Sequence, residues 1–315
     1  MTLLYEHPLF LEHDTGDHPE NAHRLISVVK RLQESGLADR CLKPDWQPVS
    51  RERLLRVHAP AYVEMLKEFC ANGGGFLDPD TIASKHSFEA ALLAAGAACD
   101  ATARVMGRED ATALCVVRPP GHHALAVKAM GFCLLNHVAI AARAATAEFQ
   151  CDRVLIVDWD VHHGNGTQDI FWEDPQVGYY SIHRAPFYPH TGRADETGAG
   201  PGVGTTLNVP IAYGMSRKKY LATIAETLSE FAARIQPQLI FISAGFDAHR
   251  SDPIGSLGLE SEDFGEMTRM VMLLAEQYCE GKIVSLLEGG YSLSALADCT
   301  AVHLTELLNL ERNRL

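Results

Sequence analysis

The sequence lacks the features that mark several classes of protein. Its eight cysteines are scattered and form no Cys-x-x-Cys pair, so we expect buried, reduced thiols in a cytoplasmic protein. Residues 1–7 have neither the charged region nor the long apolar region of a signal peptide. The most apolar stretch, residues 90–99, is shorter than the roughly 20 residues that a membrane-spanning helix needs. These absences predict a soluble intracellular protein with no membrane partner.

Positive charge is also scarce. The chain has 27 lysines and arginines against 40 aspartates and glutamates, which gives a formal net charge of −13. Direct nucleic-acid binding depends on basic surface that neutralises phosphates, so we expect none. A negative surface would still attract basic substrates such as lysine-rich tails or polyamines.

No segment has the composition of a linker between domains. The 315 residues are 47% hydrophobic and 21% charged, which is ordinary for a globular protein with a large core. No serine-rich stretch, long charge run or repeat separates the two halves. We therefore predict one domain over residues 1–315, in which the glycine-rich residues 72–75 form a loop.

Predicted strands and helices alternate along the chain. Short apolar runs predict strands at residues 113–117, 153–157, 239–243 and 283–287. Helical spacing of apolar residues predicts helices at residues 21–34, 87–106, 134–149, 216–235, 261–278 and 292–310, with Ser216 and Ser261 as N-caps. This alternation predicts an α/β fold with a parallel sheet covered by helices on both faces.

The strand at residues 153–157 is followed directly by carboxylates, imidazoles and glycines, in the sequence DWDVHHGNG at residues 158–166. Asp160 and His162 are two residues apart, so in an extended segment both side chains leave the same face. Open α/β sheets carry their sites at the carboxyl ends of the strands. One carboxylate and one imidazole could therefore bind a single metal ion there.

The other predicted strands also end in polar, titratable residues. Because parallel strands end at the same edge of the sheet, these segments should converge. The segments are RPPGHH at 118–123, AGFDAH at 244–249 and EGGY at 288–291.

In these segments the chain resembles the histone deacetylase family, and more closely its class II branch. The motifs are RPPGHHA at 118–124, DWDVHHGNGTQ at 158–168, SAGFDAHRSDP at 243–253 and EGGY at 288–291, with weaker similarity at 18–20 and 131–133. The resemblance implies the arginase/deacetylase fold, a single three-layer α/β/α domain with a central, mostly parallel sheet. It also implies hydrolysis of an acetamide.

By this resemblance, Asp160, His162 and Asp247 bind one zinc ion per chain. Three protein ligands with an open position are typical of catalytic zinc. His163 and His249 are interpreted as structural or rim residues and not as ligands. Arginase, which shares the fold, uses two manganese ions, but its second-metal carboxylates would have to stand at Gly164 and His249. A binuclear site is therefore not expected.

The tandem histidines are expected to differ in charge. The resemblance pairs His122 with Asp158 and His123 with Asn165. A nearby carboxylate favours the protonated ring, so His122 should have the higher pKa. We interpret His123 as general base and then general acid, and His122 as electrostatic support. The Tyr291 hydroxyl is the expected donor to the oxyanion.

The resemblance also implies residues around this centre. The substrate-binding candidates are Gly131 and the tunnel aromatics Phe132 and Tyr188, the rim residue Asp80, and Ile254 of the Asp-Pro loop. One potassium ion would be bound by Asp158, Asp160, His162, Ser181 and Ile182, largely through backbone oxygens, and a second by Phe171, Asp174 and Val177.

Three functions stay open at this point. The leading one is a zinc deacetylase acting on acetylated lysine in a peptide or protein, or on a similar acylated amine. The second is an acetylpolyamine amidohydrolase, although Ile254 stands where some polyamine-selective relatives have glutamate. The third is a non-catalytic acyl-lysine-binding protein. The oligomeric state, including a homo-oligomer, is left open.

Overall fold

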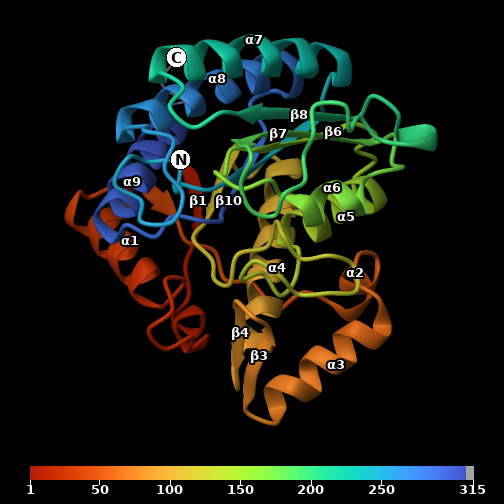
Figure 1. Cartoon of the computed structure of the whole chain (residues 1–315), viewed down its shortest axis with the longest axis vertical. Helices are drawn as coiled ribbons and strands as arrows, with labels where there is room; N and C mark the ends of the chain where they lie inside the picture. Colours follow the sequence, from red (N-terminus) through yellow and green to blue (C-terminus); the bar gives the residue numbers. More distant parts are fainter. Residues whose placement is uncertain (310–315) are drawn as a thin grey trace.

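The computed structural model describes residues 1–309 and contains one large parallel sheet (Figure 1). Within these residues the sheet has eight strands, in the spatial order β2-β1-β5-β10-β9-β6-β7-β8, and all neighbouring pairs are parallel. The strands are β1 Thr2–Tyr5, β2 Cys41–Leu42, β5 Thr112–Cys115, β6 Val154–Asp158, β7 Val177–Arg184, β8 Thr206–Ile211, β9 Leu239–Ala244 and β10 Ile283–Leu287.

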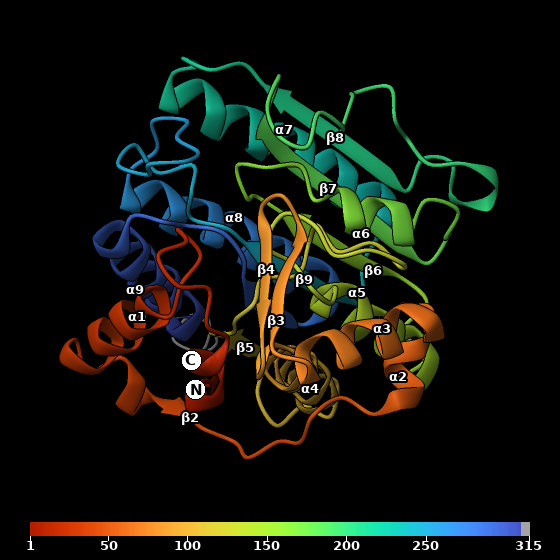
Figure 2. The ribbon, with the colours of Figure 1, turned by 60° about the horizontal axis from the view of Figure 1, so that its bottom comes forward.

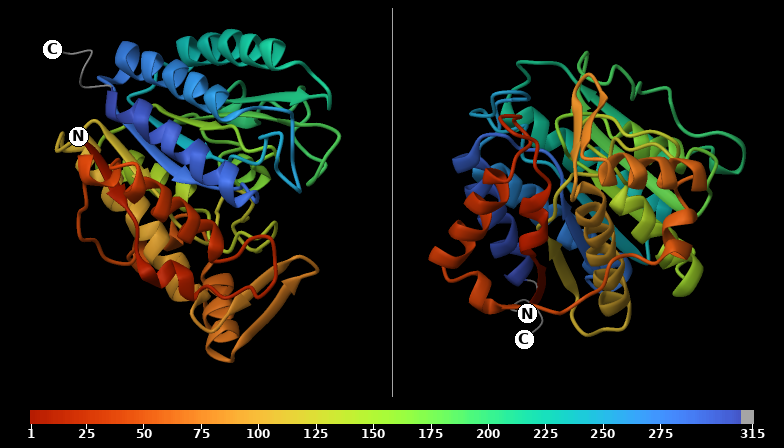
Figure 3. Two further views of the ribbon diagram at one scale, coloured as in Figure 1. Left: turned by 90° about the vertical axis from the view of Figure 1, so that its left-hand side faces the viewer. Right: turned by 90° about the horizontal axis from the view of Figure 1, so that it is seen from below.

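Helices cover both faces of this sheet. On one face α7, α8 and α9 pack side by side with α1 against α9, and on the other face α4 packs against α5 (Figure 3). The three-layer α/β/α fold predicted from the sequence is therefore confirmed. The helices are α1 His23–Glu34, α2 Arg51–Leu55, α3 Pro60–Ala71, α4 Ser87–Met106, α5 His137–Glu148, α6 Asn165–Ile170, α7 Arg217–Ile235, α8 Ser261–Cys279 and α9 Leu293–Asn309. Short 3-10 turns lie at Pro8–Glu12, Ala38–Arg40 and Gly200–Gly202.

The four central strands β5, β10, β9 and β6 are buried along their whole length. Such strands consist almost entirely of apolar residues because helices shield both of their faces from water. Their register aligns their carboxyl ends: Asp158 pairs with Ser243, and Leu287 pairs with Ala244. The loops that follow these four strands therefore start side by side.

The helix starts show where side-chain caps decide the boundary. Ser216 caps α7 as predicted, because its side chain accepts a hydrogen bond from the backbone N–H of Lys219. The predicted N-cap at Ser261 is wrong: Glu260 caps α8 in a reciprocal capping box with Asp263. The helix predicted at 134–149 begins only at His137, because Asn136 is its cap. Leu310, the predicted end of the last helix, lies outside the described residues.

A small antiparallel hairpin forms a sheet of its own, drawn in orange in front of the main sheet in Figure 2. It consists of β3 Gly74–Asp78 and β4 Thr81–Ser84. The prediction of a loop over residues 72–75 is therefore wrong for Gly74 and Gly75, which begin β3. A Cβ at Gly74 would lie 2.1 Å from the Ala83 carbonyl oxygen, so only glycine allows the strands to approach this closely.

Among residues 1–309, no helix combines the length and the apolar character that crossing a bilayer requires. All eight cysteines of the described chain are free thiols, and seven of them are buried.

Candidate functional site

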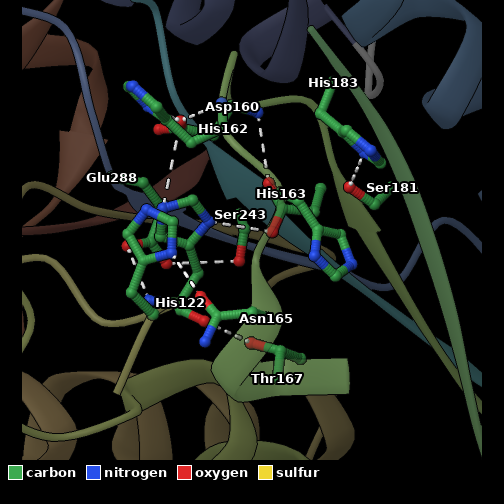
Figure 4. Close-up of polar contacts among 12 residues, drawn as sticks. His122, Asp160, His162, His163, Asn165, Thr167, Ser181, His183, Ser243 and Glu288 are labelled. Carbon is green, nitrogen blue, oxygen red and sulfur yellow. Dashed lines mark hydrogen bonds and ion pairs between the residues drawn. The ribbon is translucent and has the colours of Figure 1, made fainter. Parts of the chain in front are cut away.

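The loops after β5, β6, β9 and β10 meet at one edge of the sheet and bring the polar motifs together. Figure 4 shows His122, Asn165 and Glu288 grouped near Asp160 and His162, with Ser181 and His183 at one side. Each of these side chains comes from a segment that immediately follows a central or neighbouring strand, or from that strand itself. The site is thus positioned by the sheet.

Asp160, His162 and Asp247 form a compact group of three possible metal ligands, which we call the metal triad. One ligand atom of each lies within 4.8 Å of the others, and all three residues are buried. His162 Nδ1 lies 3.0 Å from Asp160 Oδ1 and 3.2 Å from Asp247 Oδ2. Asp247 Oδ2 accepts no hydrogen bond from any residue among 1–309. The His162 ring lies 3.2 Å from this oxygen but can offset only one of the two carboxylate charges, so a bound cation would lower the cost of burying the triad.

Glycines leave room around this group. A Cβ at Gly245 would lie 2.1 Å from Asp160 Oδ2, and one at Gly289 would lie 2.2 Å from Asp247 Oδ2. The backbone N–H of Gly289 also donates to Asp160 Oδ2 over 2.8 Å. At Gly164, where a second metal would need a carboxylate, a Cβ would lie 2.2 Å from Asp158 Oδ2. The geometry thus fits one metal ion and leaves no space for an acidic side chain at that position.

The charges in the metal triad do not balance. Burial and the neighbouring Asp160 carboxylate raise the pKa of Asp247 to about 7. Burial would lower the pKa of His162, but its contacts with Asp160 and Asp247 raise it to about 9. Both shifts indicate an excess of negative charge, which a divalent cation would neutralise.

The structure brings together both predicted histidine pairs. His122 Nδ1 lies 3.0 Å from Asp158 Oδ2, and His123 Nδ1 lies 2.7 Å from Asn165 Oδ1. Asn165 is the first residue of α6, which follows the loop that bears His162. The two rings are 4.0 Å apart between centroids, so each influences the charge of the other.

Their pKa values shift in opposite directions. Burial would lower the pKa of His122, but the charges of Asp158 and Asp160 raise it to about 10. Burial lowers the pKa of His123 well below its usual value, and the charges of His122 and His162 lower it further. At neutral pH the first ring is protonated and the second is neutral. This is the order that the sequence predicts.

Tyr291 follows Gly289 and Gly290 in the loop after β10. Its ring lies 5.8 Å from the Phe132 ring, edge to face. The Arg24 guanidinium carbon lies 5.0 Å from the Tyr291 ring centroid. Burial raises the pKa of Tyr291 well above 10, so its hydroxyl keeps its proton and can donate it in a hydrogen bond.

Glu288 is a functional residue that the sequence analysis treated only as part of a motif. Its carboxylate accepts hydrogen bonds from the backbone N–H groups of Gly121 at 2.6 Å and His122 at 3.2 Å, and from Ser243 Oγ at 3.2 Å. Burial raises its pKa to about 7. One carboxylate of the β10 loop thus holds the histidine loop against β9. The sequence could have indicated this role, because Glu288 directly follows the buried strand β10.

A buried set of ion pairs lies behind Tyr291, and sequence reasoning missed it. We call His13, Glu20, Arg24 and Arg118 the ion-pair cluster. Glu20 accepts from both Arg118 Nε at 2.5 Å and Arg24 Nη1 at 2.9 Å, and none of these three side chains is exposed. Arg24 also donates to the Gly290 carbonyl oxygen at 2.6 Å and to that of Glu288 at 2.5 Å. The cluster therefore supports the loop that carries Tyr291.

Two of the predicted substrate-binding segments, Tyr188 and Gly131–Phe132, lie beside the site histidines. The Tyr188 ring is 5.3 Å from the His123 ring and 6.1 Å from the His162 ring. A Cβ at Gly131 would lie 2.4 Å from the His123 ring, so the glycine allows the Phe132 segment to approach. Asp80 is 70% exposed in the turn of the hairpin, and its Oδ1 lies 3.5 Å from His18 Nε2. Ile254 is half-buried.

A stack of side chains extends from His162 to the surface, and this too was missed. The Phe187 ring lies parallel to the His162 ring at 5.1 Å, and the Arg184 guanidinium lies over Phe187 at 4.2 Å. The exposed Tyr213 ring covers the same guanidinium at 4.5 Å. His163 and His249 have other partners: His163 contacts Thr191 and Gln168, and His249 accepts from the backbone of Ser251.

The potassium candidates fall into two places. Asp158 and Ser181 are register partners in β6 and β7, and Ser181 Oγ lies 2.9 Å from His183 Nδ1. In the second place, the Asp174 carboxylate pairs with Arg143 and accepts from the backbone of Gln176 at 2.7 Å. Because Arg143 and Gln176 already occupy the Asp174 carboxylate, an ion at this second place would be bound by backbone oxygens. The remaining members are Asp160, His162 and Ile182 at the first place, and Phe171 and Val177 at the second.

Residues 18–307 match the histone deacetylase domain family. The chain is 40% identical over 296 residues to a probable deacetylase of Archaeoglobus fulgidus, which covers 93% of this chain and 82% of that protein. It is 39% identical over 290 residues to a histone deacetylase-like amidohydrolase of Pseudomonas aeruginosa, which covers 92% and 76%. The crystal structure of the HDA15 HD domain superposes with a TM-score of 0.91 and 35% identity, and the match covers 98% of this chain and 91% of that one.

Proposed function

The chain belongs to the histone deacetylase family, a hydrolase family of deacetylases, and from that premise we propose that it is zinc-dependent. It removes acetyl or related acyl groups from acylated lysine side chains or similar amines. The observation that carries this proposal is the metal triad, in which Asp247 Oδ2 has no hydrogen bond among the described residues, beside one protonated and one neutral histidine.

The donor set suits zinc. Two carboxylate oxygens and one imidazole nitrogen are accepted zinc ligands, and three protein ligands leave room for water and substrate. When bound, zinc supplies polarisation of the substrate carbonyl and a lowered pKa for water. The protein residues hold the ion, orient the substrate and move the protons.

His123 is the general base. Because Asn165 Oδ1 can only accept, His123 Nδ1 carries the hydrogen of their 2.7 Å bond and Nε2 keeps its lone pair. The lowered pKa of His123 means that this nitrogen is unprotonated at neutral pH and can take a proton from the attacking water. His123 then delivers that proton to the leaving amine.

His122 and Tyr291 stabilise charge. The Asp158 carboxylate keeps His122 protonated, so a positive charge lies beside His123 throughout the reaction. The protonated Tyr291 hydroxyl donates to the oxyanion that develops on the substrate. A preorganised donor of this kind contributes on the order of 3 to 4 kcal/mol to transition-state stabilisation.

Three experiments test the proposal together. We expect the purified, zinc-loaded protein to release the fluorophore from an acetyl-lysine peptide. Tyr291→Phe should lower kcat by about 100-fold or more while zinc content, measured by elemental analysis, stays at one per chain. His123→Ala should remove most turnover and leave the fold unchanged. Peptide binding without turnover in the wild type would favour the non-catalytic acyl-lysine binder, and wild-type rates in either variant would show that its role is misassigned.

Acetylpolyamines are the second candidate. Burial raises the pKa of Tyr188, and the nearby charges of Asp78 and the exposed Asp80 raise it further, so these acidic groups lie close enough to Tyr188 to attract a distal ammonium. Ile254 offers no charge to fix that ammonium in one place. We therefore expect a higher kcat/KM for acetyl-lysine peptides than for acetylspermidine or acetylputrescine. A clear preference for an acetylpolyamine would make it the substrate class.

Several finer properties belong to the same proposal. By resemblance to class II, we propose a cytoplasmic enzyme with two structural potassium ions in addition to zinc. Its single domain would act on acylated amines and bind neither nucleic acid nor membrane. The oligomeric state is left open and includes a homo-oligomer.

A further inference from the structure

One buried carboxylate outside the metal triad gathers four backbone donors. The side chain of Asp252 is 7% exposed. Its Oδ1 accepts from the N–H groups of Ile254 and Gly255, each at 2.9 Å. Its Oδ2 accepts from the N–H groups of Tyr291 at 2.7 Å and Ser292 at 3.3 Å. The two oxygens thus bind two different loops.

The first of these loops is attached to the metal triad. The Ser256 N–H donates to the Asp247 carbonyl oxygen at 2.7 Å, and a Cβ at Gly255 would lie 2.4 Å from the same oxygen. The Arg184 guanidinium, which stacks on Phe187, donates to the Gly255 carbonyl oxygen at 2.8 Å. This loop therefore keeps a fixed place relative to Asp247.

The second loop has little to fix it within its own sequence. Tyr291 follows Gly289 and Gly290, and Gly290 has φ +122°, a conformation that side-chain-bearing residues rarely adopt. Helix α9 begins only at Leu293. Arg24 holds the carbonyl oxygens of Glu288 and Gly290, which restrains the loop before Tyr291. The N–H groups of Tyr291 and Ser292 are held by Asp252.

We propose that Asp252 is a positioning residue, which sets the distance between the Tyr291 hydroxyl and the metal triad. It does so by connecting the backbone of Tyr291 to the loop fixed on Asp247. The inference rests on the proposed function, because it assigns Asp252 an effect that acts only through the Tyr291 hydroxyl. The four hydrogen bonds of its side chain go to backbone N–H groups of these two loops and not to a side chain of the metal triad.

A double-mutant cycle tests this inference. Asn at position 252 keeps the size of the side chain, but its amide group offers one acceptor oxygen and so can serve only one of the two loops. We expect Asp252→Asn to lower kcat on acetyl-lysine peptide by about 10-fold or more and to change KM by less than about 3-fold. In the Tyr291→Phe background the same substitution should lower kcat by less than about 2-fold, because the hydroxyl that it displaces is gone.

Asp263→Asn is the matched control. Asp263, in the first turn of α8, is also a buried carboxylate: it accepts a hydrogen bond from the backbone N–H of Glu260 at 2.8 Å and pairs with Arg217, the first residue of α7. It should lower thermal stability like Asp252→Asn, yet change kcat by less than about 2-fold in both backgrounds. Zinc content of all variants is measured by elemental analysis, because loss of metal would lower kcat without involving Tyr291.

Each outcome decides between the possibilities. An equal loss of kcat from Asp252→Asn with and without the Tyr291 hydroxyl, at full zinc content, would overturn the positioning role and leave the proposed function intact. Reduced zinc content in Asp252→Asn would overturn it too, since Asp252 would then act on Asp247. An inactive wild type would overturn the proposed function, and this inference with it. If Asp252→Asn does not fold, Asp252→Glu is carried through the same cycle with the same criterion.

Discussion

Two buried groups of charges both contact the loop before Tyr291, and they differ in how their charges are matched. In the ion-pair cluster, the Glu20 carboxylate is bound by Arg24 and Arg118, and the remaining arginine donors reach backbone carbonyl oxygens. In the metal triad, two carboxylates share one imidazole, and Asp247 Oδ2 has no donor among the described residues.

This difference indicates a structural role for the ion-pair cluster and a functional role for the metal triad. Burying a charge costs several kcal/mol unless partners compensate for the lost water, so a matched group can persist in a stable fold. An unmatched group requires a further partner that offsets this cost, and for the metal triad the partner that we propose is a cation. The two groups should therefore respond in opposite ways when one carboxylate is neutralised.

The largest effect is expected in the metal triad. Asp247→Asn should lower kcat/KM by about 1,000-fold or more, which corresponds to at least about 4 kcal/mol, because the zinc site that we propose would lose a ligand. The free energy of unfolding of the metal-free protein should stay unchanged or rise, since one of two repelling carboxylates is neutralised. Deacetylase assays and urea unfolding with a chelator measure the two quantities.

Added zinc provides the control for this variant. It should raise the unfolding midpoint of the wild type, because a ligand that binds only the folded state stabilises it. It should leave Asp247→Asn nearly unchanged. A destabilised metal-free Asp247→Asn would mean that the triad is a matched structural group after all.

The ion-pair cluster should show the opposite response. Glu20→Gln leaves two buried guanidinium groups without their counter-charge, so we expect the free energy of unfolding to fall by about 3 to 5 kcal/mol. Zinc content of the folded fraction should stay at one per chain. Urea unfolding monitored by circular dichroism measures the loss, and a change below about 1 kcal/mol would contradict the distinction between the two groups.

The smallest effect concerns a buried neutral histidine, which lets pH sharpen the comparison. Burial lowers the pKa of His58 to about 4, and its Nε2 accepts from the Asn136 N–H at 2.9 Å. The unfolded chain binds a proton near pH 6.5 and the folded chain only near pH 4, so stability falls as pH decreases through this window and is constant above it. The loss should approach about 3 kcal/mol.

Unfolding measured at pH 7, 5.5 and 4.5 tests this, with His58→Gln as the variant that should lose this part of the pH dependence. The Glu20 carboxylate affects stability in a lower pH range than His58. Burial would raise its pKa, but Arg118 and His13 lower it well below 4.5, so its contribution is complete above pH 4.5 and is lost only in stronger acid. Identical pH profiles of stability for His58→Gln and the wild type would contradict the role of His58 in the pH range between 4 and 6.5.

The sequence predicted what depends on local pattern. The strand at 283–287 coincides with β10, and the helix at 87–106 coincides with α4, because continuous burial and helical spacing are visible over such lengths. The order of the His122 and His123 pKa values was also predictable from the chemistry of the expected partners. The three-layer fold followed from the alternation and the resemblance.

The rest depends on contacts between distant residues. Arg118 meets Glu20 across 98 positions, and Arg24 meets the Gly290 carbonyl oxygen across 266, so neither contact leaves a local pattern. The cap of α8 fell on Glu260 because the choice between adjacent polar residues depends on the conformation of the incoming loop. The strand at Gly74 was missed because glycine more often marks a turn than the close approach of two strands.

The pairing of β6 with β9 has a consequence for the order of events during synthesis of the protein. Asp160 and His162 leave the ribosome about 85 residues before Asp247, an interval of roughly 4 to 17 seconds at common rates of synthesis. During that time the nascent chain can carry only part of the triad, and a loose pair of ligands has little selectivity among ions. If the triad is the zinc site that we propose, its three ligands come together only after β9 has paired with β6, and zinc loading follows the pairing of these two strands.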